Sequence, residues 1–414
     1  MSGRALALFE GYGIEIETAV VDRDTLDVRT IADEALRAAA GSEDWVEDHD
    51  DGEIGWSNEL VAHVVELKNR APVPGFAGLD RAFQSSLERM GSLLAEGWNA
   101  RPLPTAMHPW MDPTRETRLW PHESAPIYRA YDELFDCRRH GWSNLQSVHL
   151  NLSFSDEHEF GRLMAAVRLV LALIPALAAS SPIVEGRATG LLDNRLAFYR
   201  DNSKRVRSMT GEVIPEPIYG IAEYEERVLG AIDRELGSLG VTGPLRGGHM
   251  WTNARGAIAR FDRMAVEIRL IDRQECVRAD LALACAVSGL VRALVEECFG
   301  TFERQRAWSG ASLESLLAAA VEHGPAAAIR DADLLRLFRL PAGGSTLGEL
   351  WRAIAPDTFD GPVELEESLA VVLEHGTLAE RILRALGRDF DRAALRERYR
   401  DLCECSDANR SFRP

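Results

Sequence analysis

Three segments of the chain alternate apolar and polar residues with a period of two, the pattern of a strand that buries one face. They are Tyr12–Asp22, Ser143–Phe154 and Ala265–Asp272. In the first segment the polar positions include Glu15 and Glu17, which alternate with isoleucines. In the third segment, strict alternation places Glu267, Arg269 and Ile271 on one face. Strand-like sequence dominates the first 155 residues, so we expect a sheet built largely from this part of the chain.

Apolar residues recur at helical spacing in the segments that follow these strands. A helix is predicted to begin from an N-cap at Ser155, because acidic residues occupy the next positions. A second helix is predicted over Asp280–Cys298. From about Leu313 onward the pattern indicates a series of short helices, and one of them starts with a capping box formed by Thr377 and Glu380.

The order of these elements predicts an α+β fold with antiparallel strands and segregated helices, rather than regular βαβ alternation. We expect a main unit over residues 1–305 and a helical C-terminal region over residues 306–414. The segment Arg200–Pro217 is basic and then proline-rich. It is compatible either with a lid over an acidic substrate or with a disordered linker.

The composition restricts the partners of such a fold. Lys and Arg together number 47 and Asp and Glu 65, so the net charge is −18, which disfavours nucleic acid because phosphates are bound by cations. The most apolar run, Leu163–Ala179, contains Arg168 and Pro175 and therefore predicts a buried helix, not a membrane span. The start of the chain shows no secretory signal and the six cysteines are sparse. We therefore expect a cytoplasmic protein with no membrane partner.

Acidic residues and one histidine recur inside otherwise apolar segments. Glu15 and Glu17 lie two residues apart on the first predicted strand, so they share a face and repel unless solvent or a cation screens them. For this pair alone, an exposed strand face is the simpler interpretation. Because the pattern recurs, we expect one site that gathers Glu15, Glu17, Glu59, Glu66, His149 and Glu267. Such an oxygen-rich set suits Mg²⁺ or Mn²⁺ better than zinc.

Several arginines occur near these acids in the sequence, namely Arg195, Arg255, Arg260 and Arg269. Guanidinium groups beside a divalent cation are suited to a polyphosphate or a transferring phosphoryl group. The alternative is structural ion pairing with neighbouring acids. The sequence contains no Walker A motif, no G-x-G-x-x-G after a strand and no G-x-S-x-G. P-loop, Rossmann and serine-nucleophile sites are therefore not supported.

Six segments occur in a characteristic order: YGIEIETAVVD, NELVAHVVELKN, AMHP, VHLNLSF, LALIPALAASSPIVEGRATGLLDNR and AVEIRLIDRQECVRADLAL. In this order they resemble the type-2 glutamate–cysteine ligase family, which includes the bacterial carboxylate–amine ligases. The resemblance covers roughly Tyr12 to Glu297. Its most specific parts are the SSP…G…TG…R run and the E-x-R-x-x-D ending.

The resemblance implies a glutamine-synthetase-like fold, in which a curved antiparallel sheet forms a funnel for ATP and divalent metal ions. It matches Glu15 and Glu17 to the first-strand metal carboxylates of the family. Glu59 and Glu66 match the acids of the next segment, and Glu267 matches the late strand acid. It also matches Arg269 and Arg195 to the arginines expected near the phosphate or the acceptor carboxylate. We therefore expect catalytic roles for Arg269, Arg195 and Glu66, and nucleotide contacts for Arg255, Arg260, Arg269 and Lys68.

The chain departs from the family pattern at two places. Where many members read H-V-H-V, this chain has His149-Leu150-Asn151-Leu152. Either Asn151 supplies an oxygen ligand here or His149 binds the metal. Lys68 stands where many members carry threonine, and a lysine there is suited to an anionic substrate group. Both changes bear on whether glutamate and cysteine are the particular substrates.

These observations predict an ATP- and Mg²⁺-dependent carboxylate–amine ligase that joins two small molecules through an acyl phosphate, with glutamate–cysteine ligation as the favoured reaction. A homo-oligomer is compatible with this function. A phosphotransferase of the guanidino-kinase type, which would release a stable phosphorylated product, is a competing hypothesis. So are a ligase that acts on a different carboxylate and amine or on a peptide, and a nucleotide-binding sensor without catalysis.

Overall fold

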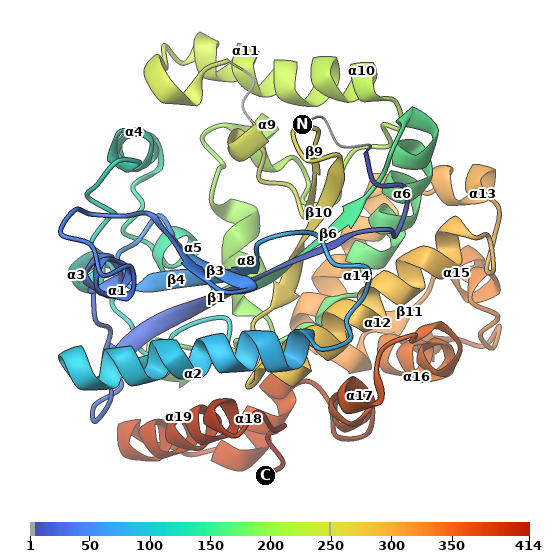
Figure 1. Cartoon of the computed structure of the whole chain (residues 1–414). Helices are drawn as coiled ribbons and strands as arrows, with labels where there is room; N and C mark the ends of the chain where they lie inside the picture. Colours follow the sequence, from blue (N-terminus) through green and yellow to red (C-terminus); the bar gives the residue numbers. More distant parts are fainter. Residues whose placement is uncertain (1–4, 248–249) are drawn as a thin grey trace.

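The computed structural model describes residues 5–247 and 250–414, and its centre is an eight-stranded antiparallel sheet (Figure 1). The order along the sheet is β2-β3-β4-β1-β6-β10-β9, and β5 pairs with the second half of β1. The strands are β1 (Tyr12–Asp22), β2 (Asp48–Asp51), β3 (Ile54–Asn58), β4 (Val64–Asn69), β5 (Ala100–Leu103), β6 (Ser147–Ser153), β9 (Ala257–Arg260) and β10 (Ala265–Asp272). The prediction of an α+β fold with antiparallel strands is confirmed.

Three long helices cover the apolar face of this sheet: α2 (Leu79–Trp98), α6 (Glu157–Leu171) and α12 (Val277–Val295). Figure 1 shows α2 running along one side of the sheet, with α10 and α11 beyond the opposite side. The strand residues on the covered face are almost fully buried; they include Ile14, Ile16, Val65, Leu67, Leu150, Val266 and Ile268. Each such side chain stabilises the fold by roughly 1.5–3 kcal/mol, so the apolar half of the alternation holds the strands in register.

Shorter elements connect the strands or lie on the other side of the sheet. They are α1 (Ala32–Ala39), α3 (Pro113–Glu116), α4 (Ala125–Phe135), α5 (His140–Ser143), α7 (Pro175–Ala178), β7 (Ile183–Val184), β8 (Arg187–Ala188), α8 (Asn194–Asp201), α9 (Arg207–Thr210), α10 (Ile221–Tyr224), η1 (Glu225–Leu229), α11 (Gly230–Ser238), η2 (Gly243–Leu245) and η3 (Met250–Thr252). The segment predicted as a lid or linker thus contains the last two residues of α8 and the short helix α9. Across the described ranges, every helix is too short or too polar to cross a bilayer.

The predicted start of the long helix after β6 is wrong by one residue. The N-cap of α6 is Asp156, whose carboxylate accepts a hydrogen bond of 2.9 Å from the backbone N–H of Glu159. Ser155 instead donates its hydroxyl to the Glu159 carboxylate, at 2.8 Å. The capping box of Thr377 and Glu380 is confirmed at the start of α18.

A β-bulge interrupts the pairing of β10 with β6. Ile268 pairs with Leu150, but the next pair is Ile271 with Val148, so one extra residue lies on β10 between the two pairs. The bulge moves Ile271 to the apolar face beside its partner and Asp272 to the polar face. The prediction that Ile271 shares the polar face is therefore wrong, because strict alternation does not anticipate an inserted residue.

The C-terminal part of the chain is helical and extends the core. Its elements are α13 (Phe302–Arg306), α14 (Gly310–His323), η4 (Gly324–Ala326), β11 (Ala328–Ile329), α15 (Ala332–Leu337), β12 (Ser345–Thr346), α16 (Leu347–Thr358), α17 (Val363–His375), α18 (Leu378–Leu386) and α19 (Arg392–Asp407). Helices α16 and α17 contact α12. A fully buried ion pair of 2.6 Å joins Arg381 of α18 to Glu275, just after β10. The boundary at residue 305 stays a prediction.

Candidate active site

The polar face of the sheet gathers charged side chains from four neighbouring strands, because paired residues of antiparallel strands point to the same side. Glu15 of β1 lies between Lys68 of β4 and His149 of β6. The next pair on this face joins Glu17 to Glu66. On the far side of β6, Glu267 of β10 pairs with Asn151. The pairing register thus assembles acids that are up to 252 residues apart, from Glu15 to Glu267.

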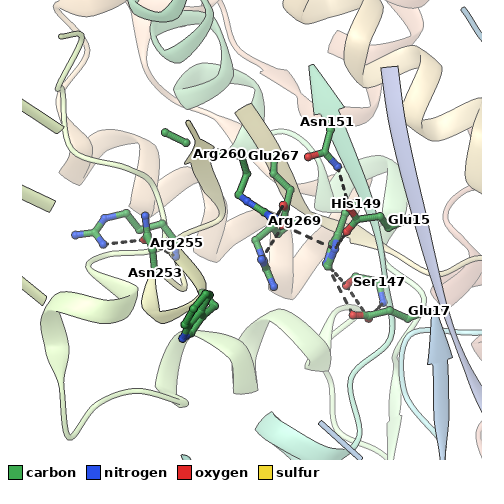
Figure 2. Close-up of polar contacts among 12 residues, drawn as sticks. Glu15, Glu17, Ser147, His149, Asn151, Asn253, Arg255, Arg260, Glu267 and Arg269 are labelled. Carbon is green, nitrogen blue, oxygen red and sulfur yellow. Dashed lines mark hydrogen bonds and ion pairs between the residues drawn. The ribbon is translucent and has the colours of Figure 1, made fainter. Parts of the chain in front are cut away.

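His149 lies at the centre of this group (Figure 2). Its Nδ1 is 3.0 Å from Glu15 Oε2 and 3.9 Å from Glu267 Oε1. Its Nε2 is 3.9 Å from Glu17 Oε1. Burial opposes protonation of the ring, yet the adjacent Glu15 and Glu17 carboxylates raise the pKa of His149. This shift favours the imidazolium, whose positive charge a bound cation would replace.

Two serines also hold the carboxylates, and neither was predicted from the sequence. Ser147 donates its backbone N–H at 2.6 Å and its hydroxyl at 2.9 Å to Glu17 Oε2. Ser57 donates its hydroxyl to Glu66 Oε1 at 2.9 Å. Ser147 lies two residues before His149 on β6, so its place on the polar face was readable from the alternation.

The acidic side chains form two groups that share Glu66. Glu15, Glu66 and His149 each offer a ligand atom, and these atoms lie within 4.8 Å of one another. The same limit holds for Glu17, Glu59 and Glu66. A carboxylate common to two groups can bridge two cations, so the arrangement offers two adjacent positions.

The protonation of these carboxylates shows how strongly they interact. Burial, followed by the charge of Glu15, raises the pKa of Glu66 to about 7. Burial and the charges of Glu17 and Glu66 raise the pKa of Glu59 well above its ordinary value. Burial also acts on Glu15, but the hydrogen bond from His149 and nearby positive charges lower its pKa to about 2. Positive neighbours thus dominate at Glu15, whereas burial and repulsion between acids dominate at Glu59 and Glu66.

The donor set fits hard divalent cations. It consists of carboxylate oxygens and one imidazole, without a thiolate, which is the ligand chemistry of Mg²⁺ and Mn²⁺. The Asn151 side chain donates to Glu15 Oε1 at 3.3 Å, while its own Oδ1 is buried and has no hydrogen-bond partner among the residues that the structure describes. Of the two candidates in the His149-to-Leu152 segment, His149 belongs to a ligand group and Asn151 lies at its edge.

Glu267 is held between two arginines (Figure 2). Arg260 of β9 lies 2.8 Å from Glu267 Oε2, and Arg269 lies 2.7 Å from Oε1. The Arg269 Nε is buried without a hydrogen-bond partner in the described part of the chain. Glu267 therefore orients the Arg269 guanidinium beside the carboxylates and leaves it with a free donor.

Lys68 places a further positively charged side chain next to the acids. Its Nζ donates to Ser57 Oγ at 2.9 Å and to Asp48 Oδ1 at 3.1 Å, and it lies 3.5 Å from Glu66 Oε1. Burial lowers the pKa of Lys68, but the charges of Glu66 and Asp48 raise it overall. The ammonium group is therefore permanently charged at neutral pH.

A cavity of about 410 Å³ opens where β1 and β10 begin and where β4 and β6 end. Glu15, Lys68, Asn151 and Arg263 line it. Arg263 belongs to the β9–β10 turn, lies 3.4 Å from Glu15 Oε1 and was not predicted from the sequence. Gly13 also lines the cavity, and a Cβ there would lie 3.0 Å from the Asn151 Cβ, so a larger residue would displace Asn151 by a few tenths of an ångström. The cavity combines positive charge with direct access to Glu15.

Two of the predicted arginines are used by the protein itself. Arg195 is buried against Asp272 and the backbone of Arg269. Arg255 forms a double ion pair with Glu216 at 2.7 and 2.6 Å, and its Nη1 donates to the carbonyl of Ser208 at 2.9 Å. Figure 2 shows Arg255 apart from the carboxylate group. Each guanidinium nitrogen of Arg255 thus has a partner within the protein, and these contacts hold the 207–217 segment in place. A nucleotide contact for Arg255 stays a prediction.

Two solved structures have the same fold as this chain. The glutamate–cysteine ligase of Francisella tularensis in complex with AMP aligns with a TM-score of 0.59 and 14% identity, covering 97% of this chain and 89% of that chain. A bifunctional glutathione synthetase from Pasteurella multocida gives a TM-score of 0.52 and 14% identity over 96% of this chain and 53% of that chain. The fold is that of the glutamine-synthetase-like ligases, as the sequence predicts.

The chain belongs to glutamate–cysteine ligase family 2, whose model matches residues 12–404. It is thus an ATP-dependent ligase that forms a carbon–nitrogen bond. A relative from Archaeoglobus fulgidus, an uncharacterized protein, is 36% identical over 69% of this chain and 75% of its own length. A Pseudomonas aeruginosa protein named "Putative glutamate--cysteine ligase 2" is 27% identical over 90% of this chain and 88% of its own length.

Proposed function

We propose that this chain is an ATP- and Mg²⁺-dependent carboxylate–amine ligase that forms an amide through an acyl phosphate, with γ-glutamyl amide formation as the favoured reaction. The observation that carries the proposal is the pair of acidic groups that share Glu66, next to a cavity with fixed positive charge. Membership of glutamate–cysteine ligase family 2 supports the same chemistry and favours it over a phosphotransferase or a sensor.

Each acidic group would hold one divalent cation. Glu15, His149 and Glu66 form the position nearer the cavity, and Glu17, Glu59 and Glu66 form the other. When bound, Mg²⁺ or Mn²⁺ neutralises phosphate charge and orients the transferring group. Glu267 would join the first position through the acceptor site that each of its oxygens keeps beside its ion pair with an arginine.

The cavity of about 410 Å³ would take the nucleotide. Lys68 and Arg263 line it and supply charge for the phosphates. The nucleotide-bound Francisella ligase supports a nucleotide in this fold. The γ-phosphate would then lie toward Glu15, at the entrance to the acidic groups.

Arg269 would stabilise the transferring phosphoryl group, because its guanidinium adjoins the carboxylates and keeps a free N–H donor. The substrate carboxylate attacks the γ-phosphorus, the bond to ADP breaks, and an acyl phosphate forms. The amine then attacks the acyl carbon, loses a proton, and displaces inorganic phosphate. No protein nucleophile is required for these steps.

The test is to incubate the purified chain with ATP, Mg²⁺ and pairs of amino acids, and to measure ADP, phosphate and the amide by mass spectrometry. We expect amide and phosphate in equal amounts, and a loss of about 100-fold or more in the Glu15→Gln variant. Glu374→Gln, an exposed glutamate on α17, is the matched control and retains full activity. A stable phosphorylated product without amide, or no ADP with any pair despite ATP binding, would contradict the proposal.

A further inference from the structure

Arg195 is a buried arginine at the start of α8. Its Nη1 and Nη2 lie 3.3 and 3.2 Å from the carbonyl oxygen of Arg269, and its Nε donates to Asp272. Its side chain is only 2% exposed. Each nitrogen of the guanidinium therefore has an acceptor within the fold.

The acceptor carbonyl belongs to the β-bulge of β10. Arg269 lies between Ile268 and Ile271, where the pairing with β6 shifts by one residue. A bulge leaves backbone groups outside the ladder, and a buried carbonyl without a donor is costly. Arg195 supplies that donor with two nitrogens, while the Arg269 N–H donates to the carbonyl of Gly256 at 2.9 Å.

Asp272, which lies on β10 like Arg269, holds the Arg195 side chain in place. Its Oδ2 accepts from the backbone N–H of Ser180 at 2.8 Å and from the Ser181 hydroxyl at 3.2 Å. The Ser181 hydroxyl in turn accepts from the backbone N–H of Arg195 at 3.1 Å. The network thus ties the start of α8 to both ends of the bulge.

We propose that Arg195 is a positioning residue that acts through Arg269 and does not contact the substrate. Because Arg195 binds the Arg269 carbonyl, it stabilises the backbone conformation of the bulge. That conformation sets the direction in which the Arg269 side chain points from β10 toward the carboxylates. This inference rests on the proposed function, because that function gives Arg269 its task. It separates two arginines to which the sequence resemblance assigns the same kind of role.

The first experiment compares Arg195→Lys with wild type. A lysine keeps the charge but has one ammonium group, which cannot bind Asp272 and the Arg269 carbonyl with the same fork. We expect kcat to fall about 100-fold, because a displaced catalytic group costs that much, while the KM values for ATP and the carboxylate substrate stay near those of wild type. A KM increase for the carboxylate with unchanged kcat would overturn the proposal, since it would indicate direct substrate binding.

The second experiment places Arg195→Lys in an Arg269→Met background. If Arg195 acts only through Arg269, the double variant is no slower than Arg269→Met alone. A further loss as large as that of the single Arg195→Lys variant would contradict the proposal. Arg381→Lys is the matched control, because Arg381 is also a buried arginine that binds a carboxylate and a backbone carbonyl, those of Glu275 and Phe412. It is expected to lower thermal stability without changing kcat.

The third measurement needs no turnover and so separates this inference from the proposed function. Amide hydrogen exchange of the 265–272 segment should be at least about tenfold faster in Arg195→Lys than in wild type or Arg381→Lys, because the bulge loses its donor. Unchanged exchange would overturn the positioning role. If wild type forms no amide but exchange in Arg195→Lys is faster, the proposed reaction fails while the structural role of Arg195 stands.

Discussion

Glu17 of β1 and Glu66 of β4 lie directly opposite each other in the antiparallel ladder, and their residues are only 9% and 8% exposed. Like charges in such a pair destabilise a sheet. The fold tolerates the pair because Glu66 takes up a proton readily, with a pKa of about 7. A divalent cation between these carboxylates would replace the proton and remove the repulsion.

Glu66→Gln tests this relationship. Without metal, we expect the variant to be more stable than wild type by about 2–3 kcal/mol at pH 8, because the buried ionised carboxylate is gone. We also expect it to lose most of the stabilisation by Mg²⁺, since Glu66 is common to both acidic groups. Thermal unfolding with EDTA and with Mg²⁺ measures both effects. A variant that Mg²⁺ stabilises as strongly as wild type would exclude Glu66 as a ligand.

Lys68→Thr tests the fixed cation of the cavity. We expect ATP affinity to fall about tenfold, because a charged contact to phosphate is lost, with little effect on thermal stability. Titration calorimetry with ATP and Mg²⁺ measures the change. Arg89→Gln is the control, since Arg89 also pairs with an acid of the β2 strand, Asp51, but lies on α2 outside the cavity. Equal ATP affinity in wild type and Lys68→Thr would remove Lys68 from the nucleotide site.

Glu314 of α14 links the C-terminal helices to the 207–217 segment by accepting the Ile214 backbone N–H at 2.6 Å. Burial raises the pKa of Glu314 to about 7 although this hydrogen bond opposes the shift. The folded pKa exceeds the ordinary value of 4.5, so the folded state binds the proton more tightly and loses stability as pH rises from about 4.5 through 7.

We therefore expect the 207–217 segment to exchange its amide hydrogens faster at pH 8 than at pH 5.5, after correction for intrinsic rates. Glu314→Gln keeps an acceptor oxygen but cannot ionise, so it should abolish this difference. Hydrogen exchange with mass spectrometry at both pH values measures it. Slower corrected exchange at pH 8 in wild type would show that the sign of the effect is wrong.

Arg381→Met tests the attachment of α18 to the main sheet. The variant leaves Glu275 as a buried charge without its partner, which costs about 3–5 kcal/mol. Denaturant unfolding measures this loss. Replacing Glu275 with Met as well should recover part of it, because no unpaired charge then remains. A loss below about 1 kcal/mol in Arg381→Met would mean that the pair is not buried in solution.

Much of the site was visible in the sequence. Glu15, Glu17 and Glu267 stand at polar positions of alternating strands, and period-two geometry alone puts each on one face. The residues not predicted from the sequence are Ser57, Ser147 and Arg263. They contact Glu66, Glu17 and Glu15, respectively, through pairing with other strands or through a turn. Such contacts depend on register between distant segments, which local patterns do not specify.

The order of residues along the chain was sufficient for the α+β class, the apolar and polar faces of the strands, the acids on the polar face and the family. Each of these follows from local periodicity or from motifs within one segment. Which partners each arginine contacts was decided only by the tertiary structure. Arg195, Arg255 and Arg269 are the same residue type in the sequence, but their partners differ. Arg195 is buried against Asp272, Arg255 forms an ion pair with Glu216, and Glu267 orients Arg269 toward the acids. A guanidinium is free for a ligand only where the surrounding protein does not already saturate it, and that depends on three-dimensional neighbours.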